Sequence, residues 1–170
     1  LGAYNEQISI IIVKDVYGEM GYYIPYIYVT NDAAMAAGRE LAGAPKKMAD
    51  IRLESEFDYI QGTLERPSGK RLITFTFKPV ERAGGSAVDA YIPYPIPLLS
   101  VRHLPWVKNT SGGVTHLTQL ISWYAEVDFH KDAKDEKMVW MGPASITYDS
   151  PSQSDPVHKL KIDEILAALY

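Results

Sequence analysis

The chain has 170 residues and a formal net charge of −4, with 46% apolar and 22% charged residues. This length and composition are typical of a single folded domain with a buried core. No basic run or stripe is present that could follow phosphates, so we expect no nucleic-acid partner. No apolar run reaches the length of a membrane span, so we expect no membrane partner either. The absence of cysteine excludes disulfides and cysteine-bound zinc, and it fits the reducing cytoplasm, where we expect the protein.

The chain opens with two segments that favour strands. Gln7–Val13 is rich in Ile and Val and is short enough for a buried strand. Tyr22–Val29 is aromatic and β-branched, which is also typical of a strand. Pro25 lies inside this second segment and has no backbone N–H to donate, so it predicts either an edge strand or a bulge.

A helix is expected next, at Ala33–Leu41, because alanine has the highest helix propensity. Asn31 or Asp32 can cap its first turn by accepting hydrogen bonds from the free N–H groups. Gly43 can adopt the left-handed conformation that ends a helix, and Pro45 prevents the helix from continuing.

The rest of the chain again favours strands. Arg71–Lys78 alternates residue by residue, as a half-buried strand does. Further strands are expected at Phe57–Leu64, Leu98–Leu104, His116–Phe129 and Met138–Tyr148. A second helix is expected at Ile162–Tyr170, since Asp163 and Glu164 would suit its first turn. The sequence therefore predicts a mainly β fold with a few helices, of the barrel or sandwich type.

Two adjacent lysines, Lys46 and Lys47, follow the end of the first helix between apolar neighbours. In an extended segment neighbouring side chains point to opposite faces, so one lysine would point into a barrel and the other away from it. Burial disfavours a charged ammonium, and a neutral amine can attack a ketone to form an imine. An arbitrary pair of lysines, by contrast, usually forms a solvated turn, because lysine is rarely buried.

Other catalytic chemistries have weaker support in the sequence. The four histidines are His103, His116, His130 and His158, and none has the close spacing of a metal-ligand pair. The Gly-x-Ser-x-Gly pattern of a nucleophile elbow is also absent. We therefore expect no metal site and no cofactor.

The segment from Asn31 to Lys47 strongly resembles the active-site segment of acetoacetate decarboxylases. The residues in register are Asn31, Gly38-Arg39-Glu40-Leu41 and Pro45-Lys46-Lys47. Two further stretches resemble the same family, namely Leu1-Gly2-Ala3-Tyr4-Asn5-Glu6 at the start and Trp140, Gly142 and Pro143 near the C-terminus. The resemblance covers nearly the whole chain, and the lysine segment is its most specific part.

The resemblance implies a closed or cone-like antiparallel β-barrel that assembles into a homo-oligomer. It assigns the Schiff base to Lys46, and it gives Lys47 the role of setting the environment of Lys46. Glu6 matches a carboxylate that would transfer protons or orient the substrate. Tyr4 matches a tyrosine that lines the substrate pocket in relatives of the family.

The activity implied is decarboxylation of a β-keto acid such as acetoacetate. One alternative is an aldolase-dehydratase that uses the same lysine imine with a 2-oxo acid such as pyruvate. Because both reactions need one neutral lysine and one carboxylate, the sequence does not separate them. A second alternative is a family member that only binds a keto acid or another protein.

The family has further N-terminal strands before the position that matches Leu1. A barrel that lacks a strand exposes unpaired backbone groups, and Gln7–Val13 is too apolar to stand as an uncovered edge. We therefore expect residues 1–170 to form a single domain completed by an N-terminal segment of the same precursor, supplied as a companion chain.

Overall fold

The computed structural model describes residues 2–84, 90–91, 95–104 and 117–170, and they are mainly β. They include an α-helix at Asp32–Glu40 and a short 3-10 helix at Val157–Lys159. By their internal contacts the residues group into two compact units. The first unit is Leu1–Met48 with Ile96–Ala125, and the second is Ala49–Pro95 with Glu126–Tyr170. The mainly β prediction is confirmed, whereas a single domain over residues 1–170 stays a prediction.

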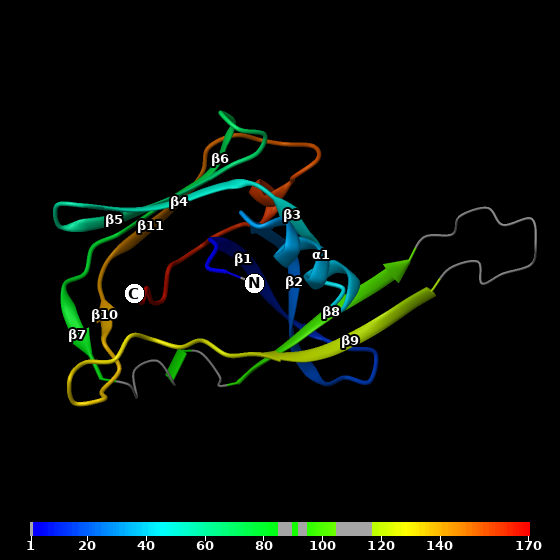
Figure 1. Cartoon of the computed structure of the whole chain (residues 1–170), viewed down its shortest axis with the longest axis horizontal. Helices are drawn as coiled ribbons and strands as arrows, with labels where there is room; N and C mark the ends of the chain where they lie inside the picture. The colour runs from blue at the N-terminus through cyan, green and yellow to red at the C-terminus, as the bar shows by residue number, and fades with distance from the viewer. Residues whose placement is uncertain (1, 85–89, 92–94, 105–116) are drawn as a thin grey trace, which may run out of the picture. The chain divides into compact units, whose positions relative to one another are not determined.

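The first unit is built on a mixed sheet in which β2 is the central strand (Figure 1). Its strands are β1 (Glu6–Lys14), β2 (Met20–Val29), β3 (Lys46–Met48), β8 (Ile96–Leu104) and β9 (Leu117–Ala125). β2 pairs antiparallel with β1 on one side and parallel with β3 and β8 on the other, while β8 and β9 pair antiparallel. The expectation of an antiparallel sheet is therefore wrong for the pairing of β2 with β3 and with β8. The physical reason is that a helix connects β2 to β3, and such a crossover returns the chain in the same direction.

Pro25 lies in an interior strand and is accommodated by a bulge. The register of β1 with β2 shifts between Ser9 and Ile11, opposite the stretch that contains Pro25. The sequence predicted that Pro25 marks either an edge strand or a bulge. The edge strand is wrong, and the bulge is confirmed.

The helix α1 (Asp32–Glu40) begins and ends where local signals predict. The side chain of Asn31 accepts a hydrogen bond from the backbone N–H of Ala34, which caps the first turn. Gly43 has a φ of 67°, the left-handed conformation expected of it. Ala34 is buried, and α1 packs against β3 and β2.

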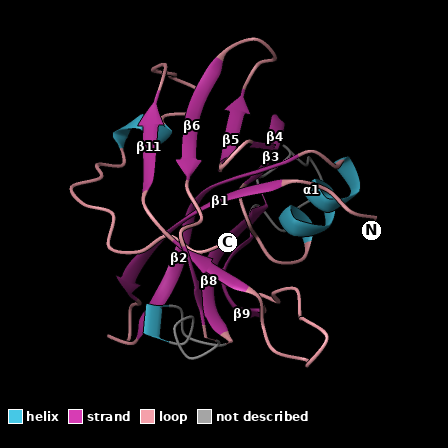
Figure 2. Ribbon diagram, turned by 90° about the vertical axis from the view of Figure 1, so that its left-hand side faces the viewer, coloured by secondary structure: helices cyan, strands magenta, loops and turns pink. Residues whose placement is uncertain are grey.

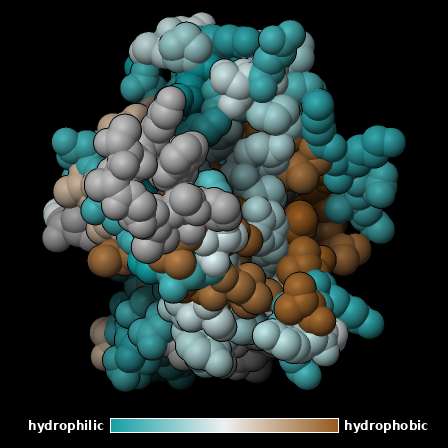
Figure 3. Space-filling view, turned by 90° about the vertical axis from the view of Figure 1, so that its right-hand side faces the viewer, coloured by the Kyte–Doolittle hydropathy of each residue, from teal (hydrophilic) through white to brown (hydrophobic). Residues whose placement is uncertain are grey.

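The strand β1 is more exposed than its apolar sequence predicts. Ile10, Ile11 and Ile12 are all exposed, and among the described residues β1 pairs with β2 alone. The prediction of a buried strand at Gln7–Val13 is therefore wrong for these residues. Large apolar side chains outside β1, such as Val16 and Leu41, are exposed as well. Figure 3 shows apolar atoms, in brown, on one face of the molecule.

The second unit holds two antiparallel sheets. The larger has the order β11-β6-β5-β4, visible from left to right in Figure 2. Its strands are β4 (Asp50–Glu56), β5 (Tyr59–Glu65), β6 (Arg71–Phe77) and β11 (Ala144–Tyr148), and the smaller sheet pairs β7 (Glu81–Ala83) with β10 (Val139–Met141). Arg82 ties β7 to the segment that precedes β10. Its hydrogen bond to Asp132, together with the backbone N–H groups of Glu136 and Lys134, lowers the pKa of the Asp132 carboxyl.

Two predictions fail near the C-terminus. The strand expected at Met138–Tyr148 is broken after Met141, because β10 pairs with β7 whereas β11, which begins at Ala144, pairs with β6 in the other sheet. The helix expected at Ile162–Tyr170 is absent from the structure. Instead the backbone of Tyr170 exchanges two hydrogen bonds with Trp140, at 2.8 and 2.9 Å, and this pairing holds the end of the chain extended.

None of the three sheets formed by the described residues closes on itself, so the closed barrel is not seen in them. No helix in this part of the chain is long and apolar enough to cross a membrane. Leu1 begins the N-terminal stretch that resembles the family, and His116 begins the strand expected at His116–Phe129. Both residues lie outside the described residues.

Candidate active site

The pairing of three strands places Lys46 and Glu6 on one face of the sheet. Lys46 lies opposite Ile27 on β2, and Ile27 lies opposite Ile8 on β1. Paired residues share a face, and so do residues two apart in a strand, so Glu6 points to the same side as Lys46. Only β2 separates the two strands, and a lysine side chain is long enough to reach across it.

The amine of Lys46 meets the carboxylate of Glu6 in this position. Nζ of Lys46 is 2.8 Å from Oε2 of Glu6, and the side chains are 10% and 29% exposed. The ring of Tyr4 lies beside them, with its centroid 5.7 Å from Nζ, within the range of a cation–π contact. The lysine is thus largely shielded from solvent, and the nearest carboxylate is close enough to take up or return its proton.

Gly38 provides the space for the aliphatic part of Lys46. A Cβ at position 38 would lie 2.5 Å from Cδ and 2.7 Å from Cε of Lys46. Both distances are shorter than van der Waals contact. A glycine within a helix ordinarily weakens it, but Gly38, in the last turn of α1, is required by the lysine packed against it.

We expect Gly38→Ala to lower the reactivity of Lys46 while leaving the protein folded. Alanine favours a helix by up to about 1 kcal/mol over glycine, but its methyl group forces the lysine side chain to move. The measurement is the rate of imine formation with a keto acid, set beside thermal unfolding. Ala36→Gly, at an exposed position of the same helix, is the control that changes helix propensity alone. An unchanged rate in Gly38→Ala would contradict this role for Gly38.

The turn that leads into Lys46 is anchored by β8. The hydroxyl of Ser100, which is fully buried, donates to the carbonyl oxygen of Ala42 and accepts from Nε1 of Trp123 at 3.2 Å. Nη1 of Arg102 donates to the carbonyl oxygen of Glu40 at 3.0 Å. These residues hold the backbone that positions Lys46, and no sequence motif indicates them. The signal that could have found Ser100 is a single serine inside an otherwise apolar strand segment.

Ser100→Ala is expected to destabilise the protein by about 1–3 kcal/mol, because the Trp123 indole and the Ala42 carbonyl lose a buried partner. Chemical denaturation measures the effect. Ser122→Ala on the neighbouring strand β9 is the matched control, since Ser122 is exposed. Equal stability of the two variants would show that the Ser100 hydroxyl does not anchor the turn.

Lys47 faces different neighbours from Lys46, as alternation along a strand predicts. It lines a separate pocket in the first unit together with Arg39, Arg102 and His103. The structure therefore brings Lys46, Glu6 and Tyr4 together, and it places Lys47 against another group of side chains.

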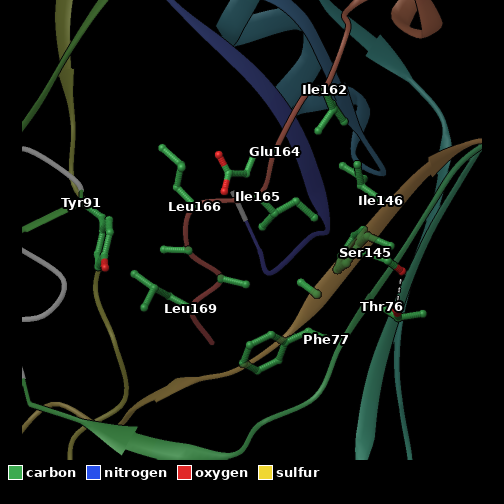
Figure 4. Close-up of a pocket in the computed structure, with 14 residues that line it drawn as sticks. Thr76, Phe77, Tyr91, Ser145, Ile146, Ile162, Glu164, Ile165, Leu166 and Leu169 are labelled. Atoms are coloured by element: carbon green, nitrogen blue, oxygen red, sulfur yellow. Dashed lines mark hydrogen bonds between the residues drawn. The ribbon is translucent and has the colours of Figure 1, made fainter.

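A larger apolar groove lies within the second unit (Figure 4). It has a volume of about 720 Å³ and is bordered by β6, β11 and the extended segment that includes Ile162, Ile165, Leu166 and Leu169. Glu164 is the sole charged residue among its described lining residues. The described lining includes no lysine, so it offers no amine that could form an imine. No group of three or more His, Asp or Glu side chains that could hold a metal occurs in the described residues.

The described residues are mainly β, and their shielded Lys46 is hydrogen-bonded to the carboxylate of Glu6. A lysine in such a position can form an imine with a ketone. The family model described as "Acetoacetate decarboxylase (ADC)" matches residues 1–170. The chain belongs to the acetoacetate decarboxylase family.

Individual relatives agree with this assignment. "Acetoacetate decarboxylase 2" of Mesorhizobium japonicum is 31% identical over 170 residues, which covers 99% of this chain and 59% of the relative. The crystal structure of acetoacetate decarboxylase from Legionella pneumophila matches with a TM-score of 0.78 at 25% identity, over 99% of this chain and 62% of that one. The enduracididine biosynthesis enzyme MppR complexed with pyruvate shares the fold, with a TM-score of 0.69 at 16% identity, over 98% of this chain and 61% of that chain. This chain thus spans about three fifths of the length of each.

Proposed function

We propose that the protein containing this chain is a lysine-dependent decarboxylase that acts on a β-keto acid of the acetoacetate type. The observation that supports this most is the Lys46 amine, mostly shielded from solvent and 2.8 Å from the Glu6 carboxylate. Family membership over residues 1–170 agrees with it. Activation of a lysine by desolvation is a known property of acetoacetate decarboxylase, so that part of the mechanism is taken from the family.

The proposed reaction starts with removal of a proton from the Lys46 ammonium, for which Oε2 of Glu6 is the nearest carboxylate acceptor. The neutral amine attacks the ketone carbon of the substrate, and loss of water gives a protonated imine. The bond to the carboxylate carbon then breaks, carbon dioxide leaves, and the electron pair moves into the imine to form an enamine. A proton returned to carbon restores the imine, and water releases the ketone product.

Two neighbouring residues have supporting roles in this proposal. Tyr4, whose ring lies 5.7 Å from the amine, would form part of the wall of the substrate pocket. Lys47 would influence Lys46 through the backbone of β3, since its side chain lines a different pocket. A closed or cone-like barrel, a homo-oligomer and a cytoplasmic location are further parts of the proposal that come from the resemblance.

A second candidate reaction uses the same imine to form a carbon–carbon bond. MppR, which has the same fold, is described in complex with pyruvate and with the condensation product of pyruvate and imidazole 4-carboxaldehyde. In that reaction the enamine attacks an aldehyde, so the lysine and carboxylate required are the same.

Product analysis separates the candidates. We expect the protein to release carbon dioxide from acetoacetate and to give no condensation product from pyruvate and an aldehyde. A condensation product without carbon dioxide release would establish the second candidate instead. Absence of both products, with a keto acid still bound, would identify a binding protein and refute the proposed decarboxylase.

A further inference from the structure

A pocket of about 230 Å³ lies beside Lys47, in the same unit as Lys46 but lined by different side chains. Three elements contribute basic residues to it: Arg39 from the last turn of α1, Lys47 from β3, and Arg102 and His103 from β8. The remaining residues that line it are Gly43, Ala44, Pro45 and Val101. The described lining thus contains no acidic residue, in a chain whose net charge is −4.

The guanidinium of Arg102 is held in a fixed orientation at this pocket. Its Nε and Nη2 donate to Oε1 of Gln119, and its Nη1 donates to the carbonyl oxygen of Glu40 at 3.0 Å. A guanidinium has five N–H donors, and these contacts use three of them. A side chain fixed in this way loses little freedom when its other donors bind an anion, which favours binding.

The backbone around the pocket is also tightly packed. Gly43 has a φ of 67°, and a Cβ there would lie 2.7 Å from the backbone nitrogen of Arg102. Nδ1 of His103 lies 2.8 Å from the hydroxyl oxygen of Thr118, which orients the ring. The basic side chains therefore extend from a backbone that is already fixed in place.

The end of α1 opposes anion binding, since a helix C-terminus has a partial negative charge of about half a unit. Arg102 already donates to one of the last carbonyl oxygens, at Glu40. Arg39, Lys47 and Arg102 all line the pocket, so their basic side chains outnumber this single partial charge.

We propose that this pocket is a binding site for a phosphate group, separate from the Lys46–Glu6 pair. Arginine forks match the oxygen geometry of phosphate, and lysine adds a point charge. The volume accommodates a phosphate group together with several waters, each of which takes about 30 Å³. The source of the group is either free phosphate or a small phosphate monoester. The proposal holds whether or not Lys46 forms an imine.

The test is a titration of the protein with inorganic phosphate at constant ionic strength, followed by calorimetry and by amide chemical shifts. We expect saturable binding, with shifts concentrated at Gly43, Val101 and His103. Arg39→Gln should weaken binding by roughly tenfold, the loss of one charge-assisted hydrogen bond. Glutamine suits a helix, and Arg39 is exposed, so the variant should fold normally.

Lys14→Gln is the matched control, because it removes one positive charge from an exposed position on β1 of the same unit. It should leave phosphate affinity unchanged. A parallel titration with glycerol phosphate identifies the source: tighter binding of the ester indicates a monoester ligand, and equal affinity indicates free phosphate. Unsaturable binding, equal weakening in both variants, or equal affinity for acetate would overturn the proposal.

Discussion

Replacing Lys46 with alanine is expected to abolish carbon dioxide release from acetoacetate. The reaction needs a primary amine that is shielded from water and close to a proton acceptor, and Lys46 has both properties, with Glu6 at 2.8 Å. The side chain of Lys47 lines another pocket, so it is not placed to replace Lys46. Lys47→Ala should therefore lower turnover less than Lys46→Ala does.

Loss of activity in Lys46→Ala could also follow from loss of structure, so a second variant is needed. Lys46→Arg keeps a positive charge opposite Glu6 but cannot form a stable imine. We expect Lys46→Arg to unfold at a temperature close to that of the parent protein and to be inactive. Normal turnover in either variant would exclude an imine on Lys46.

Glu6→Gln is expected to reduce turnover on the order of 10²-fold or more while the fold is retained. Glutamine has nearly the same shape as glutamate and can still accept a hydrogen bond from Lys46, but it cannot take up the proton. Steady-state kinetics and thermal unfolding together measure the two effects.

Glu19→Gln is the matched control, because Glu19 precedes β2 at an exposed position and should leave turnover unchanged. If Glu6→Gln and Glu19→Gln have the same kinetics, the Glu6 carboxylate transfers no proton in the slow step. Its contact with Lys46 would then be a structural ion pair alone.

Local signals predicted the helix and its surroundings correctly. Asn31 caps α1 and Gly43 has a positive φ, because both effects depend on a few neighbouring residues. The different environments of Lys46 and Lys47 follow from alternation in a strand, which is also local. The resemblance singled out Glu6 and Tyr4, and the structure places both beside Lys46.

Features that depend on distant parts of the chain were missed. The strand β4 has an acidic, mostly exposed sequence, so its pairing with β5 leaves no apolar pattern to recognise. The parallel pairing of β2 with β8 joins Tyr22 to Leu98, which are far apart in sequence. Ser100 and Arg102 anchor the lysine turn through contacts that no spacing indicates. The segment before Tyr170 is extended because its end pairs with Trp140, which outweighs its helix propensity.

The most direct test of the central claim is borohydride trapping on the intact protein with acetoacetate as substrate. Borohydride reduces an imine to a stable secondary amine, and peptide mapping by mass spectrometry then locates the modified lysine. We predict one modified peptide, with the adduct on Lys46, and no adduct in Lys46→Arg. An adduct on Lys47, or no adduct under conditions where carbon dioxide is released, would contradict the assignment of the Schiff base to Lys46.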